Sequence, residues 1–237
     1  MSSVLSAKTR VVTDKISIVV PTVGQILDDE QAYFSLATSL SSIPFDMKVQ
    51  LDDIGVDYES ITEYQLFLSV FSGLKESGTD TSLIFGDLDL SKFRLATKEG
   101  SEDPILYDEE NDIVIDEFVQ FKIAETLREI NSFEKSTKKA ANKSAKKYLI
   151  ELERKKQKRL AKQKKGLYLE NLVSALVNQG GFKYNFETVM DVSIYKLNIS
   201  FKALRKYMNF KQTMQGYYSG NVDISKVPED TLNWVLL

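Results

Sequence analysis

One segment in the middle of the chain is far more basic than the sequence on either side of it. Residues 133–166 contain 14 Lys and Arg residues but only 3 Asp and Glu residues, and neither Gly nor Pro interrupts them before Gly166. Ala, Lys, Glu, Gln, Arg and Leu dominate the second half of this segment, and these residues favour helix. Because a helix this polar cannot form a core, the segment is expected to connect two apolar modules.

The chain has 237 residues, which is enough for two small domains. We predict a mixed α/β module over residues 15–132 and a small helical module over residues 167–237. Residues 133–166 are predicted to be a Lys-rich helical linker, and the Ser- and Thr-rich residues 1–14 a flexible N-terminus. Because strand signals are confined to the first module, the predicted fold class is α+β.

Short runs of β-branched and aromatic residues in the first module predict strands. The clearest pair of runs brackets the polar, turn-prone residues 108–112, and this arrangement predicts a β-hairpin. The runs lie at residues 16–20, 83–85, 93–97, 105–107 and 113–115.

Several segments have apolar residues at helical spacing and follow a residue that can cap a helix. In the first module such helices follow Asp29, Ser60 and Asp116. The second of them is apolar on all sides and is expected to be largely buried. In the second module we predict a helix that ends at Gly180, a short one after Asn185, and two more at residues 193–208 and 210–218.

The chain contains no Cys and no His. Without Cys it has no thiol nucleophile and no thiolate metal site, and without His it lacks the commonest general base and zinc ligand. Ser-His-Asp triads, Cys-His dyads and zinc fingers are therefore excluded. We predict a protein that is not an enzyme, holds no metal or cofactor, and acts by binding other macromolecules.

Three weaker patterns also favour structural interpretations. Asp87 and Asp89 could hold a magnesium ion, but they are more simply a turn cap. The acidic residues 108–112 lack the Gly and the spaced Glu of a calcium loop. Gly24 is solitary, and no glycine-rich phosphate loop occurs in the chain.

The N-terminus has no apolar stretch typical of a secretory signal, and no apolar run approaches the roughly 20 residues that span a bilayer. These two observations predict a cytoplasmic protein that does not contact membranes.

The basic segment has two interpretations. Its cations could contact phosphates and give salt-dependent nucleic-acid binding. Against this, residues 137–165 contain a single aromatic residue, Tyr148, so no stacking platform accompanies the charge. We favour a solvated linker or a helix neutralised by an acidic surface, and keep nucleic acid as the alternative. The cations concerned are Arg154, Lys155, Lys156, Lys158, Arg159, Lys162, Lys164 and Lys165.

Short stretches scattered over most of the chain resemble proteins of tailed phages of Gram-positive hosts. These proteins are similar to tail assembly chaperones or to other tail and baseplate assembly factors. The stretches are residues 46–55, 107–117, 169–178, 182–186, 214–223 and 232–234.

The resemblance implies an assembly factor that coats the hydrophobic tape-measure protein, helps to gather tail-tube subunits, and leaves before the particle matures. This chain is long for such a chaperone and has a separate β-hairpin, so a permanent tail or baseplate protein is the alternative. The residues expected to contact a protein partner are Phe182, Tyr184, Tyr217, Tyr218 and Trp234.

Overall fold

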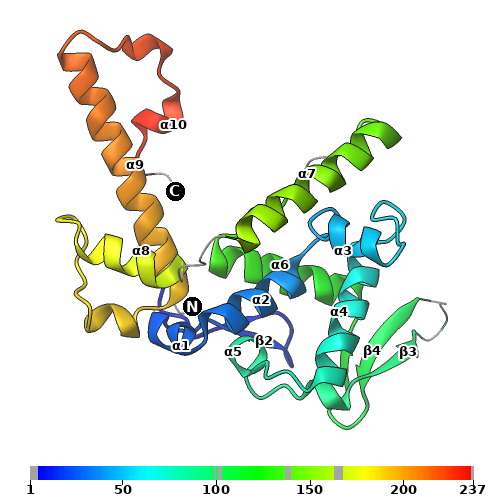
Figure 1. Cartoon of the computed structure of the whole chain (residues 1–237). Coiled ribbons are helices and arrows are strands. Elements are labelled where there is room, and N and C mark those ends of the chain that lie inside the picture. The colour runs from blue at the N-terminus through cyan, green and yellow to red at the C-terminus, as the bar shows by residue number, and fades with distance from the viewer. Residues whose placement is uncertain (1–4, 99, 101–102, 137–139, 163–167, 236–237) are drawn as a thin grey trace.

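The computed structural model describes residues 5–98, 100, 103–136, 140–162 and 168–235. It confirms the α+β class, with helices and two small antiparallel sheets (Figure 1). The α-helices are α1 (Val23–Asp28), α2 (Glu30–Ser41), α3 (Lys48–Asp53), α4 (Glu63–Ser77), α5 (Ser82–Phe85), α6 (Glu117–Asn131), α7 (Lys143–Ala161), α8 (Tyr168–Val177), α9 (Ile194–Tyr218) and α10 (Glu229–Leu232). The 3-10 helices are η1 (Leu90–Lys92), η2 (Thr188–Asp191) and η3 (Ile224–Lys226). The strands are β1 (Thr9–Val11), β2 (Ser17–Val19), β3 (Arg94–Thr97), β4 (Pro104–Asp108) and β5 (Ile113–Ile115).

The first sheet holds the N-terminal part of the chain against the body. Strand β1 pairs with β2 in antiparallel register. The Arg10 guanidinium lies 4.8 Å from the centre of the Tyr195 ring, and its Nη2 lies 3.2 Å from Glu129 Oε1. Thr9–Val11, which lie within the N-terminus predicted as flexible over residues 1–14, thus form a strand that backbone pairing and the Arg10 contacts hold against the body. The first four residues lie outside the described part of the chain.

The second sheet confirms the predicted hairpin. Its strands follow the order β3-β4-β5, and both pairs are antiparallel. At the turn, the buried Asp108 carboxylate accepts hydrogen bonds from the backbone N–H groups of Glu110 and Asn111, at 3.0 and 3.3 Å. Lys15 Nζ lies 2.9 Å from Asp112 Oδ2. These carboxylates are thus engaged in forming the turn, as the sequence interpretation predicted.

Side-chain caps explain where the helices of the body begin. Asp29 and Asp116 each accept a hydrogen bond from a backbone N–H in the first turn of the helix that follows, as predicted. The helix predicted after Ser60 begins two residues later. There Thr62 Oγ1 accepts from the Gln65 N–H at 3.1 Å, and Gln65 Oε1 accepts from the Thr62 N–H at 2.9 Å. This reciprocal pair satisfies two N–H groups that a helix leaves free at its start.

Residues 83–85 form a helical turn, so the strand predicted there is wrong. The Thr81 carbonyl oxygen accepts hydrogen bonds from the N–H groups of Ile84 and Phe85, at 2.9 and 2.8 Å. Gly86, with φ of 62°, ends the turn. A run of three apolar residues has no period that distinguishes strand from helix, and this turn buries Ile84 and Phe85 in the core.

One core contains residues from both predicted modules. Backbone hydrogen bonds join them, from the Val23 N–H to the Val192 carbonyl (2.8 Å) and from the Ile194 N–H to the Pro21 carbonyl (2.9 Å). A Cβ at Gly24 would lie 3.2 Å from the Met190 carbonyl oxygen, so this glycine lets η2 approach α1 closely. The core includes Ile16, Ile26, Leu40, Phe71, Ile123 and Leu127 from the first module, and Leu169, Val173, Leu176, Val189, Ile194 and Leu197 from the second.

Helix α7 packs against α3, whereas the sequence predicted a solvent-exposed bridge. Asn142 Oδ1 caps it by accepting from the Ala145 N–H at 2.8 Å. Ile150 completes a second, smaller apolar cluster, whose other buried members are Val49, Leu51, Tyr58 and Leu66. The body thus supplies an apolar seat for Ile150, the buried residue of α7, while most other residues of this helix are exposed. Residues 137–139 and 163–166 of the predicted linker lie outside the described residues.

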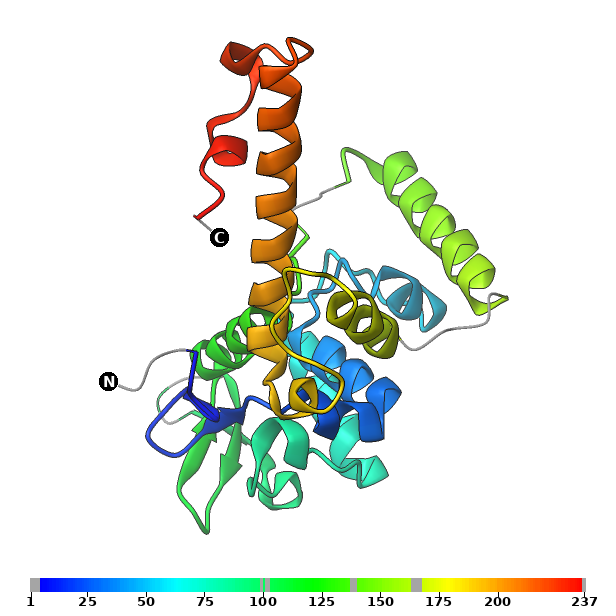
Figure 2. The ribbon, with the colours of Figure 1, turned by 90° about the vertical axis from the view of Figure 1, so that its left-hand side faces the viewer.

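The two helices predicted at residues 193–208 and 210–218 form the single helix α9. No residue between them breaks a helix, so α9 continues for 25 residues and projects from the body (Figure 2). After it the chain turns back, with the Asn221 and Val222 N–H groups donating to the Gly216 carbonyl oxygen at 2.9 and 3.1 Å. We call α9 from Ala203 onward, together with residues 219–235, the arm.

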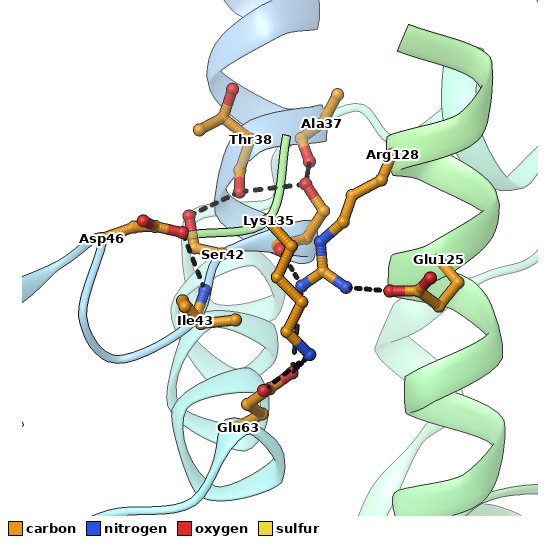
Figure 3. Close-up of polar contacts among 10 residues, drawn as sticks. Ala37, Thr38, Ser42, Ile43, Asp46, Glu63, Glu125, Arg128 and Lys135 are labelled. Carbon is orange, nitrogen blue, oxygen red and sulfur yellow. Dashed lines mark hydrogen bonds and ion pairs between the residues drawn. The ribbon is translucent and has the colours of Figure 1, made fainter. Parts of the chain in front are cut away.

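A buried arginine joins α2, α4 and α6 (Figure 3). Arg128 is 7% exposed, and its guanidinium donates to the Ser41 carbonyl oxygen and to Glu125 Oε1, each at 2.5 Å. Its Nη2 also lies 3.9 Å from Glu63, which is bound in turn by Lys135 Nζ at 2.8 Å. These contacts fix the end of α2 beside the groove described next.

Candidate partner-binding surface

Helix α8 is fixed on its inner side and open on its outer side. Leu169, Val173 and Leu176 recur at helical spacing and are buried in the core. The Glu30 carboxylate of α2, itself 6% exposed, accepts hydrogen bonds from the N–H groups of Leu169 and Glu170, at 2.9 and 3.4 Å. A carboxylate at this position accepts hydrogen bonds from N–H groups that the helix leaves free, and its negative charge interacts favourably with the positive end of the helix dipole. Glu30 therefore sets where α8 begins.

An apolar groove runs between α8 and α9. It has a volume of about 280 Å³, and its walls are mainly aliphatic and aromatic side chains. A larger groove of about 950 Å³ continues from it towards α2 and α6, and the two share Leu172, Phe201 and Arg205. We call the two together the α8–α9 groove. Its apolar lining includes Phe34, Leu172, Leu176, Phe201, Leu204 and Met208.

The arm exposes aromatic side chains beyond the end of the groove. Only Ile194 and Leu197 of α9 are buried, and both lie in its first turn. Tyr207 is 43% exposed and Tyr218 78% exposed, so much of the apolar surface of the arm meets solvent. The arm therefore makes few of the contacts that usually stabilise a long helix within its own chain.

The five predicted partner-contact residues fall into two groups. The rings of Phe182 and Tyr184 lie 5.5 Å apart in the loop between α8 and η2. Tyr217 and Tyr218 also lie 5.5 Å apart, at the outer end of α9, and Trp234 packs 5.1 Å from the ring of Tyr207. The structure thus places the first pair in the loop that follows α8 and the other three residues on the arm.

Some cations of the basic segment have acidic partners and others do not. Arg154 binds Asp52 and Asp53, at 2.7 and 2.5 Å, and Lys156 Nζ lies 3.5 Å from Glu153. Within the described residues, no carboxylate binds Lys155, Lys158, Arg159 or Lys162. Lys164 and Lys165 lie outside the described residues.

The C-terminal third of the chain contains α8, α9 and the arm. Residues 156–235 match the family model described as YomV second domain. This is a phage-type protein family of Bacillus, so the match indicates that the protein is phage-related. No curated protein and no solved structure matches the chain.

Within the part of the chain that the structure describes, no three Asp or Glu side chains are grouped so that they could hold a metal ion. In the same part of the chain, every helix is too short or too polar to cross a membrane.

Sequence reasoning missed the groove, although it identified the apolar faces that line it. Helical spacing showed that Leu172, Leu204 and Met208 lie on apolar faces, but not that α8 and α9 diverge and leave those faces partly open. The Glu30 contact was missed because Glu30 and Leu169 are 139 residues apart. The only available signal was α9 itself, whose apolar residues spread too widely for a single buried face.

Proposed function

We propose that the protein is a non-enzymatic assembly factor of a tailed phage, which binds a helical segment of another protein in the α8–α9 groove. The observation that carries the proposal is the groove whose apolar part lies between α8 and α9, next to an arm with exposed aromatic side chains. A partner helix that lays its apolar face in such a groove buries that face from water. The match to a phage-type family covers this same part of the chain.

Within tail assembly, we propose a chaperone of the tape-measure or tail-tube protein. A long, apolar helical protein needs its apolar face covered before assembly, and the apolar part of the groove and the exposed aromatic side chains of the arm offer apolar surface for that purpose. Helix α9 alone, with 25 residues, is about 37 Å long, enough to cover several turns of a partner helix.

Co-expression with the tape-measure protein of the same phage tests the proposal. We expect a soluble complex that co-purifies, and we expect Leu204→Glu to abolish it because a charge would stand in the groove wall. Leu95→Glu is the matched control, since Leu95 is 66% exposed on β3, away from the groove. An insoluble tape-measure protein in the presence of the parent chain contradicts the proposal, and so does equal loss of the complex in both variants.

Mass spectrometry of mature particles separates a chaperone from a permanent tail component. A chaperone leaves before maturation, so we expect no more than trace amounts in purified particles. Retention at a fixed ratio to the tube subunit would assign the chain to the tail structure.

A further inference from the structure

Helix α7 packs against α3, so some of its cations face the body and others face solvent. Lys146 and Arg154 stand one turn before and one turn after Ile150, so all three face the body. Lys146 Nζ binds Asp57 and Glu59, and Arg154 binds the end of α3. The chain therefore supplies acidic side chains that neutralise part of α7, but they reach only the cations that face the body.

The opposite face of α7 keeps its charge. Lys155, Arg159 and Lys162 follow i, i+4, i+7 spacing and are all exposed, with Lys158 beside them. The two acidic residues of α7 lie close to cations of the same helix, Glu151 at 3.5 Å from Arg154 and Glu153 at 3.5 Å from Lys156. We call Lys155, Lys158, Arg159 and Lys162 the outward basic face.

An aromatic side chain shares this side of the helix. Tyr148 is 65% exposed, and it stands seven residues before Lys155 and so on the same side. Tyr148 is the single aromatic residue within residues 137–165, and the structure leaves its side chain open to solvent. A base can stack on such a ring while the cations contact the backbone.

Helix α9 is also basic. It carries Lys196, Lys202, Arg205, Lys206 and Lys211, and the sequence has no acidic residue between Asp191 and Asp223. Lys202 and Arg205 line the α8–α9 groove, so these two cations belong to that surface and not to the outward basic face. Although the whole chain has a net charge of −3, helices α7 and α9 therefore each carry an excess of positive charge.

We propose that the outward basic face of α7 binds the phosphate backbone of a nucleic acid. From Lys155 to Lys162 the helix rises roughly 10 Å. One strand of a duplex presents a phosphate about every 3.4 Å of axis, so a rigid row of this length meets about three phosphates. The apolar seat of Ile150 holds α7 in place and keeps the row presented to solvent. This activity is separate from the protein contact proposed for the α8–α9 groove.

Fluorescence anisotropy with a labelled 20-nucleotide single strand and a 20-base-pair duplex tests the proposal. We expect the full chain to bind at least one of them at 50 mM salt. The triple variant Lys155→Gln, Lys158→Gln, Arg159→Gln should weaken binding about tenfold or more. It should also lower the slope of log affinity against log salt by about 2 to 3, one counterion per lost phosphate contact. Gln keeps the helix propensity of the replaced residues.

The matched control removes three charges elsewhere, through Lys98→Gln, Lys183→Gln and Lys226→Gln. It should bind within about twofold of the parent chain, since none of these residues lies on α7 or α9. Equal circular dichroism spectra of both variants establish that the fold is retained.

Three results would overturn the assignment. They are no binding by the parent chain at 50 mM salt, equal weakening in the control, and equally tight binding of a poly-glutamate peptide, which would point to an acidic protein partner.

Discussion

Replacing Arg128 with Met tests how far one buried cation holds three helices together. Met keeps the apolar stem but removes the guanidinium, so the Ser41 carbonyl oxygen loses a donor at 2.5 Å. A buried carbonyl left without a partner costs about 1–3 kcal/mol. Glu125 and Glu63 keep side chains that are 49% and 35% exposed, so water can solvate them, and each lost ion pair adds roughly 0.5 kcal/mol. We therefore expect a loss of about 2–4 kcal/mol in the free energy of unfolding.

Urea unfolding followed by far-ultraviolet circular dichroism measures this loss. The fluorescence of Trp234 is unsuitable because that residue lies on the arm and does not report on the core. Arg94→Met is the control, since Arg94 also pairs with a glutamate at 2.5 Å but its side chain is 60% exposed, and it should cost less than about 1 kcal/mol. Equal losses in the two variants would refute the argument that burial of Arg128 decides the cost.

Three further predictions follow from the same structure. Burial is the main reason that the pKa of Tyr64 is raised from its ordinary value of 10.0 to about 12. The stability that depends on the neutral phenol is therefore complete below pH 10 and is lost as the pH rises towards 12. For Tyr64→Phe, the urea midpoint should fall less steeply over this alkaline range than it does for the parent chain. Glu30→Ala should cost about 1–2 kcal/mol by removing the cap of α8, and Glu30→Gln less, as thermal unfolding will show. A Cβ at Gly216 would lie 2.6 Å from a Val222 methyl group, so Gly216→Val should release the returning tail and expose Trp234, which a red shift of its emission measures.

The sequence predicted features that depend on neighbouring residues. Asp29 and Asp116 were identified as helix caps, and residues 108–112 as a hairpin turn, because each uses hydrogen bonds that reach only two or three residues along the chain. The fold class followed from the same signals. The strand predicted at residues 83–85 failed because that run is too short to show a period.

Contacts between distant residues could not be predicted in this way. The basic segment was identified correctly as a helix former, but its acidic partners are Asp52, Asp53, Asp57 and Glu59, which lie about 90–100 residues earlier. Nothing in the sequence of the basic segment or of the acidic segment indicates that the two pair with each other. The strand at Thr9–Val11 was missed for the same reason, since Arg10 is fixed by residues of α6 and α9.

The two proposed surfaces lie on different helices and depend on opposite physical effects. The α8–α9 groove buries apolar side chains, and burial of this kind is strengthened by salts that are excluded from protein surfaces. The outward basic face releases counterions from a nucleic acid, and that binding weakens steeply as salt rises. Ile150 and the ion pairs of Lys146 and Arg154 hold α7 on α3, and no residue that lines the groove lies on α7, so neither surface needs the other to be vacant. One chain can therefore hold a protein helix on α8 and α9 while α7 contacts a nucleic acid.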